Sequence, residues 1–404
     1  MVKESLEEWG VKEQVLGMVF DTTASNSGEY SGACKYLEEW LGCPVLWLAC
    51  RRHIAELHLG TAVRLVMGAT KDPGMALFRR LRAEWRELDI DYSNLELTDF
   101  SSASLALQEA AKKVLSWAKE QLAAGTFPRD DYKEFMELVV VSLGGEVVGF
   151  IFKLPGPDHH ARFMSKCLYI LKIKLLRRIF KLSDGEEEQV SSLTEYILLF
   201  YAVVWFTTPL ASSAARHDLE FMSNILEYRK VNPQLAFAVL SSTYRHLWYL
   251  TPQLITLALT DAGLEDTVRE GMAKALHSQE RVQIKTGKPV FPVLNHGATM
   301  VRGDMAGLVG PESWLVFDLL QLAGDQDWLL ASASTWHLSR NYKQLQIFTE
   351  NLTAINNLAE RGIHLATDYI KRVESEEQRQ ALFQVVEEFR SRVKDTSKAS
   401  LMLC

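Results

Sequence analysis

Two short apolar runs near the start of the chain constrain its fold more than any other feature. Residues 16–20 and 45–49 are continuously apolar rather than alternating, which is typical of strands that are covered on both faces. A stretch of helical composition, residues 28–41, lies between them, with one predicted face formed by Ala33, Tyr36, Leu37 and Trp40, and another helical stretch follows residue 50. This order predicts a parallel unit, in which functional groups gather at the carboxyl ends of the strands.

The first candidate residue is Asp21, which closes the first apolar run and is followed by the small polar sequence TTASN. A carboxylate at a strand end can bind a divalent metal ion or orient phosphate chemistry. Aspartate followed by threonine and serine also suits a helix N-cap or a turn. The local sequence leaves both interpretations of Asp21 open.

The second run leads into Cys50, Arg51, Arg52 and His53. Cys50 and His53 have the spacing of half a zinc site, but no second half stands at a recognisable spacing. The sequence favours a structural role, with Cys50 buried at the strand end and His53 hydrogen-bonded at the start of the next helix. Arg51 and Arg52 lie near a helix N-terminus and are candidates for phosphate contacts, although adjacent arginines are also common on plain surfaces.

The rest of the chain is predicted to be helical. Helical spacing continues from residue 54 to about residue 282 and returns after a glycine-rich connection at 287–310, with a solvated loop expected at Asp184-Gly185. One late helix is expected to carry an apolar stripe from Phe348 to Ile370, with Glu360 on a different, polar face. The expected fold class is therefore mainly α with a small α/β part.

Charge and apolar content limit the partners of the chain. A formal net charge of −7 means that nucleic-acid binding would need a local basic patch. The best candidate for such a patch is one basic stretch that follows Arg162, although its charged face could also be merely solvated. Its basic residues are Lys166, Lys172, Lys174, Arg177, Arg178 and Lys181. Five scattered cysteines fit a reducing compartment. With no secretory signal and no apolar run near the roughly 20 residues that span a membrane, we expect a soluble, intracellular protein with no membrane partner.

Three groups of residues resemble the DNA transposases of the hobo/Activator (hAT) superfamily. In that family a catalytic aspartate ends a strand and precedes a small-polar-Asn segment, as Asp21 does here. A Cys-x-x-His motif ends the next strand, as with Cys50 and His53, and a catalytic glutamate follows a tryptophan-containing stretch, as Glu360 follows Trp336. The segments FDTTASN, HLWYL and AERG are also similar to segments of a group of transposase-derived proteins.

The resemblance implies a partial ribonuclease H-like core that is interrupted by a large all-helical insertion domain. It divides the chain into core residues 1–60, an insertion at 61–335, and helices at 336–404 that complete the core. In an intact relative, Asp21 and Glu360 would bind Mg²⁺ or Mn²⁺ for DNA cleavage and joining, supported by Cys50 and His53. It also leads us to expect DNA as a partner, a homo-oligomer, and a nuclear location if the source is eukaryotic.

The same family has another catalytic aspartate on a three-stranded hairpin upstream of the position of Asp21. Only 20 residues precede Asp21 here, and residues 2–11 predict a helix, so we expect an N-terminally incomplete active site with little or no strand-transfer activity. Two metal ions about 3.5–4 Å apart need several carboxylates to hold them. Asp21 and Glu360 alone would bind Mg²⁺ weakly.

Two alternative functions remain open. The chain could be a domesticated transposase remnant that acts as a helical DNA-binding or protein-interaction module, which its acidic net charge favours. It could also be a phosphotransferase of the sugar-kinase and actin-like group, in which an aspartate followed by two threonines contacts ATP phosphates. That motif lies in a hairpin with a glycine before the threonines, and the sequence after Asp21 has neither feature.

Overall fold

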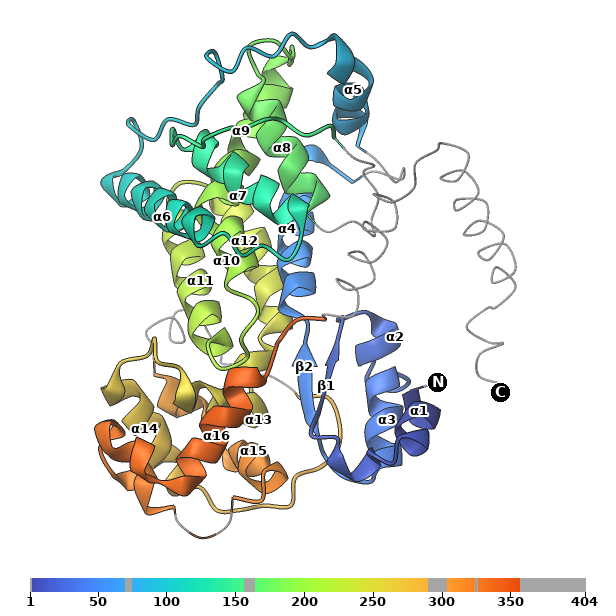
Figure 1. Ribbon diagram of the computed structural model, residues 1–404, viewed down its shortest axis with the longest axis vertical. Coiled ribbons are helices and arrows are strands. Elements are labelled where there is room, and N and C mark those ends of the chain that lie inside the picture. The colour runs from blue at the N-terminus through green and yellow to red at the C-terminus, as the bar shows by residue number, and fades with distance from the viewer. Residues whose placement is uncertain are drawn as a thin grey trace. The chain divides into compact units, whose positions relative to one another are not determined.

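The computed structural model describes residues 2–69, 75–155, 164–289, 304–322, 324 and 326–356. These residues are mainly helical and include one two-stranded parallel sheet (Figure 1). The predicted class, mainly α with a small α/β part, is therefore confirmed. The chain divides into two compact units, Met1–Ile355 and Asn356–Cys404, and all the helices and strands below belong to the first.

The sheet is formed by β1 (Gly17–Phe20) and β2 (Leu46–Ala49), which pair in parallel with Gly17 opposite Leu46. Every residue of β2 is buried. In β1 the burial alternates, and Val19 is 38% exposed. Both predicted strands are present, but only β2 is covered on both faces.

A turn precedes the helix that connects the strands. After α1 (Val2–Glu8) and β1, the short helix α2 (Ala24–Ser27) leads to a turn, and α3 begins only at residue 33 (Ala33–Leu41). A Cβ atom at Gly32 would lie 2.6 Å from backbone oxygen atoms of Asn26 and Gly28. This close approach requires glycine, and the predicted helix start at residue 28 is wrong for that reason.

The buried face of α3 includes an acidic residue. Glu38 is buried, and its carboxylate accepts hydrogen bonds from the backbone N–H groups of Val45 (3.0 Å) and Gly287 (2.6 Å). Tyr36 is 54% exposed, so the predicted apolar face of this helix is wrong at that position. Glu38 ties α3 both to the loop before β2 and to a segment distant in sequence.

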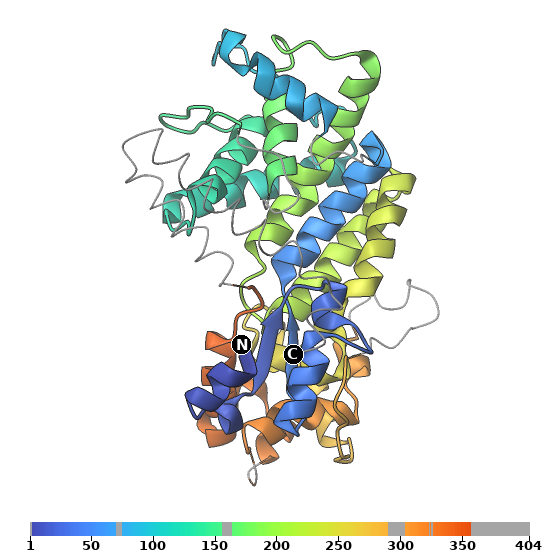
Figure 2. The same cartoon turned by 90° about the vertical axis from the view of Figure 1, so that its right-hand side faces the viewer.

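Helices that follow β2 carry most of the core. Their bounds are α4 (Arg51–Met67), α5 (Ala76–Glu84), α6 (Leu105–Ala124), α7 (Asp130–Ser142), α8 (Ser165–Leu175), α9 (Asp184–Tyr196), α10 (Ala202–Phe206), α11 (Ala214–Tyr228) and α12 (Pro233–Thr243). Helix α4 lies along α12 and also contacts α8, α9 and α10 (Figure 2). Because α4 leaves directly from the end of β2, it joins the sheet to the helical region without a linker.

A π-helical turn, Ile197–Tyr201, joins α9 to α10. Helix α9 begins at Asp184 because Ser183 and Glu186 form a capping box there. The loop predicted at Asp184-Gly185 is therefore wrong. Among the described residues, the stretch Asp184–Phe206 is long and apolar enough to cross a membrane by length and composition, and 61% of its apolar window is buried inside the protein, as in the core helix of a soluble protein.

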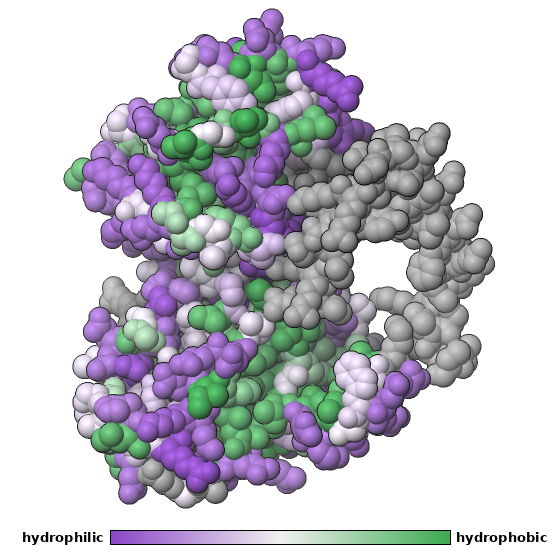
Figure 3. Space-filling model, in the orientation of Figure 1, coloured by the Kyte–Doolittle hydropathy of each residue, from purple (hydrophilic) through white to green (hydrophobic). Residues whose placement is uncertain are grey.

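The last part of the first unit contains short helices and 3₁₀ turns. Its helices are α13 (Pro252–Ile255), α14 (Asp266–His277), α15 (Leu315–Leu319) and α16 (Arg340–Asn351). Helix α16 ends at residue 351, after which Thr353 pairs with Leu210 in an antiparallel bridge. The predicted single helix across Leu352 is therefore wrong at this point. On the face shown in Figure 3, polar side chains predominate, and apolar ones gather over α13, α15 and the strands.

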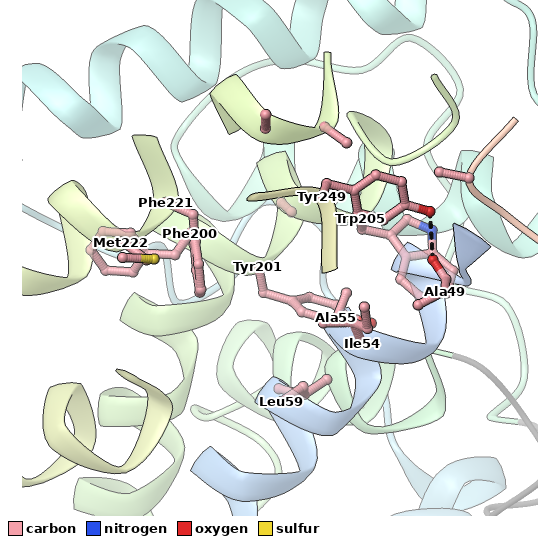
Figure 4. Packing of buried hydrophobic residues seen from close by; sticks show 14 of the residues in the cluster. Ala49, Ile54, Ala55, Leu59, Phe200, Tyr201, Trp205, Phe221, Met222 and Tyr249 are labelled. Atoms are coloured by element: carbon pink, nitrogen blue, oxygen red, sulfur yellow. Dashed lines mark hydrogen bonds between the residues drawn. The ribbon is translucent and has the colours of Figure 1, made fainter. Parts of the chain in front are cut away.

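The apolar core is continuous from the sheet into the helical region. Figure 4 shows Trp205 and Tyr249 packed beside the end of β2, with Ile54 and Leu59 of α4 nearby. The Tyr249 hydroxyl donates a hydrogen bond to the carbonyl of Ala49 at 2.7 Å. This contact fixes the carboxyl end of β2 within the core.

Candidate functional site at the strand ends

Asp21 follows β1 and is held by its own neighbours in sequence. One carboxylate oxygen, Oδ1, accepts hydrogen bonds from the backbone N–H (3.0 Å) and hydroxyl (2.5 Å) of Thr23 and from the amide of Asn26 (2.8 Å). Burial raises the pKa of Asp21, but these bonds outweigh it and hold the pKa below its ordinary value. The carboxylate is ionised at neutral pH, and none of the described residues donates a hydrogen bond to Oδ2.

His53 lies in the first turn of α4 and interacts electrostatically with Asp21. Burial lowers the pKa of His53, and the charge of Asp21 only partly offsets this effect, so the imidazole is neutral at pH 7. Within the described part of the chain His53 has no hydrogen-bond partner, which differs from the predicted bond at the helix start. The site therefore combines an ionised carboxylate with a neutral imidazole.

Backbone hydrogen bonds bring a third segment to this edge. The N–H of Cys50, which is buried as expected, donates to Phe20 at 2.7 Å. The next N–H, that of Arg51, donates to the carbonyl of Ala354 at 2.8 Å, and the Ala354 N–H donates to Pro209 at 2.8 Å. Figure 1 shows the segment after α16 running to the ends of the two strands. Residues 352–355 thus lie beside the strand ends.

Arg51 and Arg52 point into the helical core. Arg51 is 4% exposed and bonds to Asp218 (2.6 Å) and to the carbonyl of Thr207 (3.1 Å). Arg52 is 6% exposed, donates to the Tyr132 hydroxyl (2.9 Å) and stacks over the Tyr132 ring. Neither guanidinium reaches the surface. Arg51 and Arg52 are therefore too buried to make the predicted phosphate contacts.

The basic stretch in and after α8 does not form one exposed face. Lys172 is buried and paired with Glu134 at 2.6 Å. Lys174 is half-buried and donates to Ser191, whereas Arg178 is exposed and paired with Glu96 at 2.8 Å. Arg162 lies outside the described residues. Burial removes Lys172 from the predicted DNA-contacting surface, and the two exposed or half-exposed members already have partners.

A group of histidines around the Arg51–Asp218 pair was not predicted. His58, His217 and His246 come from α4, α11 and the 3₁₀ turn Tyr244–His246. Burial and nearby positive charges lower the pKa of His58 to about 3, of His217 to about 3 and of His246 to about 4. No local sequence pattern marks this group, because its members come from distant segments.

His58 is the most buried of the three. Its ring stacks on Phe221 with centroids 5.3 Å apart, and neither ring nitrogen has a hydrogen-bond partner among the described residues. The adjoining cavity, about 10 Å³, has room for about one water molecule. As far as the structure describes the chain, His58 is therefore packed in the core with unpaired ring nitrogens, and no open site adjoins it.

Metal binding needs more oxygen ligands than Asp21 supplies. In the described ranges, no group of three or more His, Cys, Asp or Glu side chains is arranged to hold a metal ion. Glu360, the other predicted ligand, lies outside the described residues. The strand-end edge thus offers one free carboxylate oxygen and a nearby neutral histidine.

Comparison of the chain with protein-family models, curated proteins and solved structures finds no match. The transposase resemblance therefore rests on the residues around Asp21, Cys50 and Glu360. The predicted domain division also stays a prediction.

Proposed function

We propose that this chain is a transposase-derived protein related to the hAT superfamily, and that its strand-end edge belongs to a partial ribonuclease H-like core. Three features support the proposal. A parallel β–α–β unit carries an ionised carboxylate, Asp21, at the end of one strand. Cys50 and His53 follow the neighbouring strand, and a large helical region follows them.

The hydrogen bond between Arg51 and Ala354 carries most of the argument. It brings the chain back to the strand ends only six residues before Glu360. We propose that this late glutamate shares a metal site with Asp21, and the metal-binding experiment below tests this.

Asp21 and Glu360 would hold the metal ion, with Cys50 and His53 supporting the edge. Mg²⁺ and Mn²⁺ favour oxygen ligands, and Oδ2 of Asp21 is such a ligand. When bound, the ion would stabilise charge on a phosphodiester. Two carboxylates bind such ions weakly, so we expect little or no strand transfer from this chain by itself.

Mn²⁺ binding tests the proposal, with free Mn²⁺ measured by electron paramagnetic resonance. We expect weak binding that Asp21→Asn and Glu360→Gln each reduce at least tenfold. Asp91→Asn is the matched control, because Asp91 accepts the same pair of local bonds, from the N–H and hydroxyl of Ser93, but lies away from the strands. Equal binding by all four proteins would contradict the metal site.

Plasmid nicking separates a weak site from an active nuclease. With Mg²⁺ or Mn²⁺ and supercoiled DNA, we expect no nicking above that of the Asp21→Ala protein. A metal-dependent nick that disappears in Asp21→Ala would show that the chain is an active enzyme and overturn the expected inactivity.

A second function, nucleic-acid binding without cleavage, is supported by exposed cations that lack ion-pair partners. Arg64, Arg245 and Lys288 are of this kind within the described residues. Changing Lys172, Lys174 and Arg178 together is a poor test of this function, because Lys172 is buried in an ion pair. Salt-dependent binding of DNA without cleavage would favour this binding function over an enzymatic one.

A further inference from the structure

Two recesses share one arginine. The first lies between α3 and the turns that follow α12, and the second lies between α4, the start of α8 and the end of α12. The first has a volume of about 490 Å³ and the second about 550 Å³. Their charged and aromatic lining residues are Glu29, Lys35, Tyr244, Arg245, Trp248 and Lys288 in the first, and Glu56, Arg64, Lys166, Arg245 and His246 in the second. Arg245 belongs to both, so the recesses adjoin.

The cations in these recesses are largely unpaired. Arg64, Arg245 and Lys288 are exposed, and Lys166 is half-buried; no carboxylate among the described residues forms an ion pair with any of the four. Among the residues that the structure describes, Lys35 pairs only with Glu39 of its own helix, at 3.7 Å. Exposed pairs of this kind contribute little free energy and are readily exchanged for another anion.

Two carboxylates also line the recesses, but they do not cancel this charge. Glu56 accepts hydrogen bonds from the Tyr201 hydroxyl and from the Met164 N–H (3.0 Å). Burial raises the pKa of Glu56, which favours its neutral form. Glu29 is exposed at the rim of the first recess. With Glu39 counted as the partner of Lys35, five cations thus face at most three negative charges, in a chain whose net charge is −7.

The fold fixes the backbone that carries two of these cations, Lys288 and Arg245. Glu38 binds the N–H of Gly287, which fixes the segment that carries Lys288. Gly287 has φ +135°, a conformation that favours glycine. The Lys288 ammonium lies 4.9 Å from the centre of the Trp248 ring. Arg245 extends from the turn that ends α12, which packs along α4. Backbone bonding and packing therefore position Lys288 and the start of the Arg245 side chain.

We propose that the two adjoining recesses bind the sugar-phosphate backbone of a single-stranded nucleic acid, with the half-buried Tyr244 ring stacking on one base. Five cations that line two adjoining recesses suit a polyanion better than a single phosphate. Recesses of this volume are typical of small-ligand sites, and we expect a single strand to enter them more readily than a duplex. Cations beside an aromatic ring are the usual combination for single strands. The proposal deepens the proposed function, because it assigns a nucleic-acid ligand to the same protein.

Fluorescence anisotropy of a labelled oligothymidine tests the proposal, with a strand of about 20 nucleotides, longer than common site sizes. The double variant Arg245→Gln/Lys288→Gln should weaken binding at least tenfold. For this double variant, the slope of log K against log salt concentration should be smaller in magnitude by about 1.4, because each phosphate contact on a single strand contributes about 0.7. The control Lys113→Gln/Arg229→Gln changes the net charge equally at exposed residues outside the recesses and should have little effect.

Tyr244→Leu tests the stacking contact separately. It should weaken binding about tenfold without changing the salt dependence, because stacking releases no counterions. Thermal unfolding followed by circular dichroism must show that each variant is folded. Equal weakening by the control pair, equal affinity for a duplex of the same length, or equal competition by polyglutamate of the same charge would each overturn the proposal.

The two proposals fail independently. Binding is measured in EDTA, and Asp21→Asn should bind the strand as tightly as the unchanged protein. Loss of strand binding in that variant would overturn the assignment to these recesses. Absence of Mn²⁺ binding would contradict the metal site and leave strand binding intact.

Discussion

Asp21 and Arg51 follow neighbouring strands, yet their surroundings differ. Within the described ranges, the Asp21 side chain bonds only to residues up to five positions along the chain, and its Oδ2 has no hydrogen-bond donor. Arg51 is buried and bonds to Thr207 and Asp218, which belong to distant segments. Position at a strand end therefore does not make a polar side chain available to a ligand. A polar side chain at a strand end is unavailable to a ligand when the helical region supplies it with a buried partner.

The largest expected effect comes from Arg51→Met. Removing the guanidinium leaves Asp218, of which 19% is exposed, without its partner. Breaking a buried ion pair in this way costs about 3–5 kcal/mol. Urea unfolding at pH 7 measures the loss. The double variant Arg51→Met/Asp218→Leu should recover most of it, and a double variant as unstable as the single one would show that the pair is not the cause.

The second largest effect is expected from acid, which should destabilise the folded protein through the histidine group. In the folded protein the pKa values of His58, His217 and His246 lie at about 3 to 4, below the value of about 6.5 for the unfolded chain. Stability is therefore complete above about pH 6.5 and falls as the unfolded chain takes up protons, by about 1.4 kcal/mol per pH unit for each histidine. Urea unfolding between pH 7 and pH 4 measures the slope.

His58→Phe sharpens this test. The phenyl ring keeps the stacking on Phe221 and removes two buried nitrogen atoms that lack partners. We expect equal or higher stability at pH 7 and a slope smaller by one proton between pH 6 and pH 4. An unchanged slope would mean that His58 is not one of the groups responsible.

Asp21→Asn should have a smaller effect on folding, because the side chain is half-exposed and an asparagine oxygen can still accept the local bonds. We expect a loss below about 1 kcal/mol at pH 7. The lowered pKa of Asp21 means that its charge contributes stability above the unfolded pKa of about 3.9, and that this contribution disappears as the pH falls through the folded value. The variant and the unchanged protein should therefore differ less at pH 3 than at pH 7. A loss like that of Arg51→Met would make Asp21 a structural residue.

Arg178→Gln should have the smallest effect. Its ion pair with Glu96 is exposed, with 53% of the arginine side chain accessible. Such pairs are worth about 0–1 kcal/mol, so we expect a change in the free energy of unfolding below about 0.5 kcal/mol. A loss above about 1 kcal/mol in urea unfolding would show that exposure does not predict the weight of an ion pair in this protein.

The sequence predicted the features that local pattern determines. Apolar continuity located both strands, and helical spacing located most helices of the middle region. The errors lie where particular backbone contacts decide the boundary. The close approach at Gly32 delays α3, the capping box at Ser183 begins α9 early, and the bridge between Leu210 and Thr353 follows the end of α16.

The candidate site was predictable in part. The turn bonds of Asp21 are local, so the sequence TTASN was enough to suggest them. The burial of Arg51 and Lys172 was not predictable, because Asp218 and Glu134 come from helices distant in sequence. The return of Ala354 to the strand ends has no local signal either, since it depends on backbone bonds to Arg51 and Pro209.

The π-helical turn Ile197–Tyr201 has a consequence for how the length of this chain can vary. Such a turn holds one residue more than an α-helical turn, while the helices on either side keep their orientation. Deleting one residue elsewhere in the stretch Asp184–Phe206 would rotate all later side chains by about 100° around the axis. Deleting one within the π turn would instead yield a regular helix, with Tyr196 and Trp205 still facing their present neighbours. A one-residue deletion should therefore disturb this helix least when it falls within the π-helical turn.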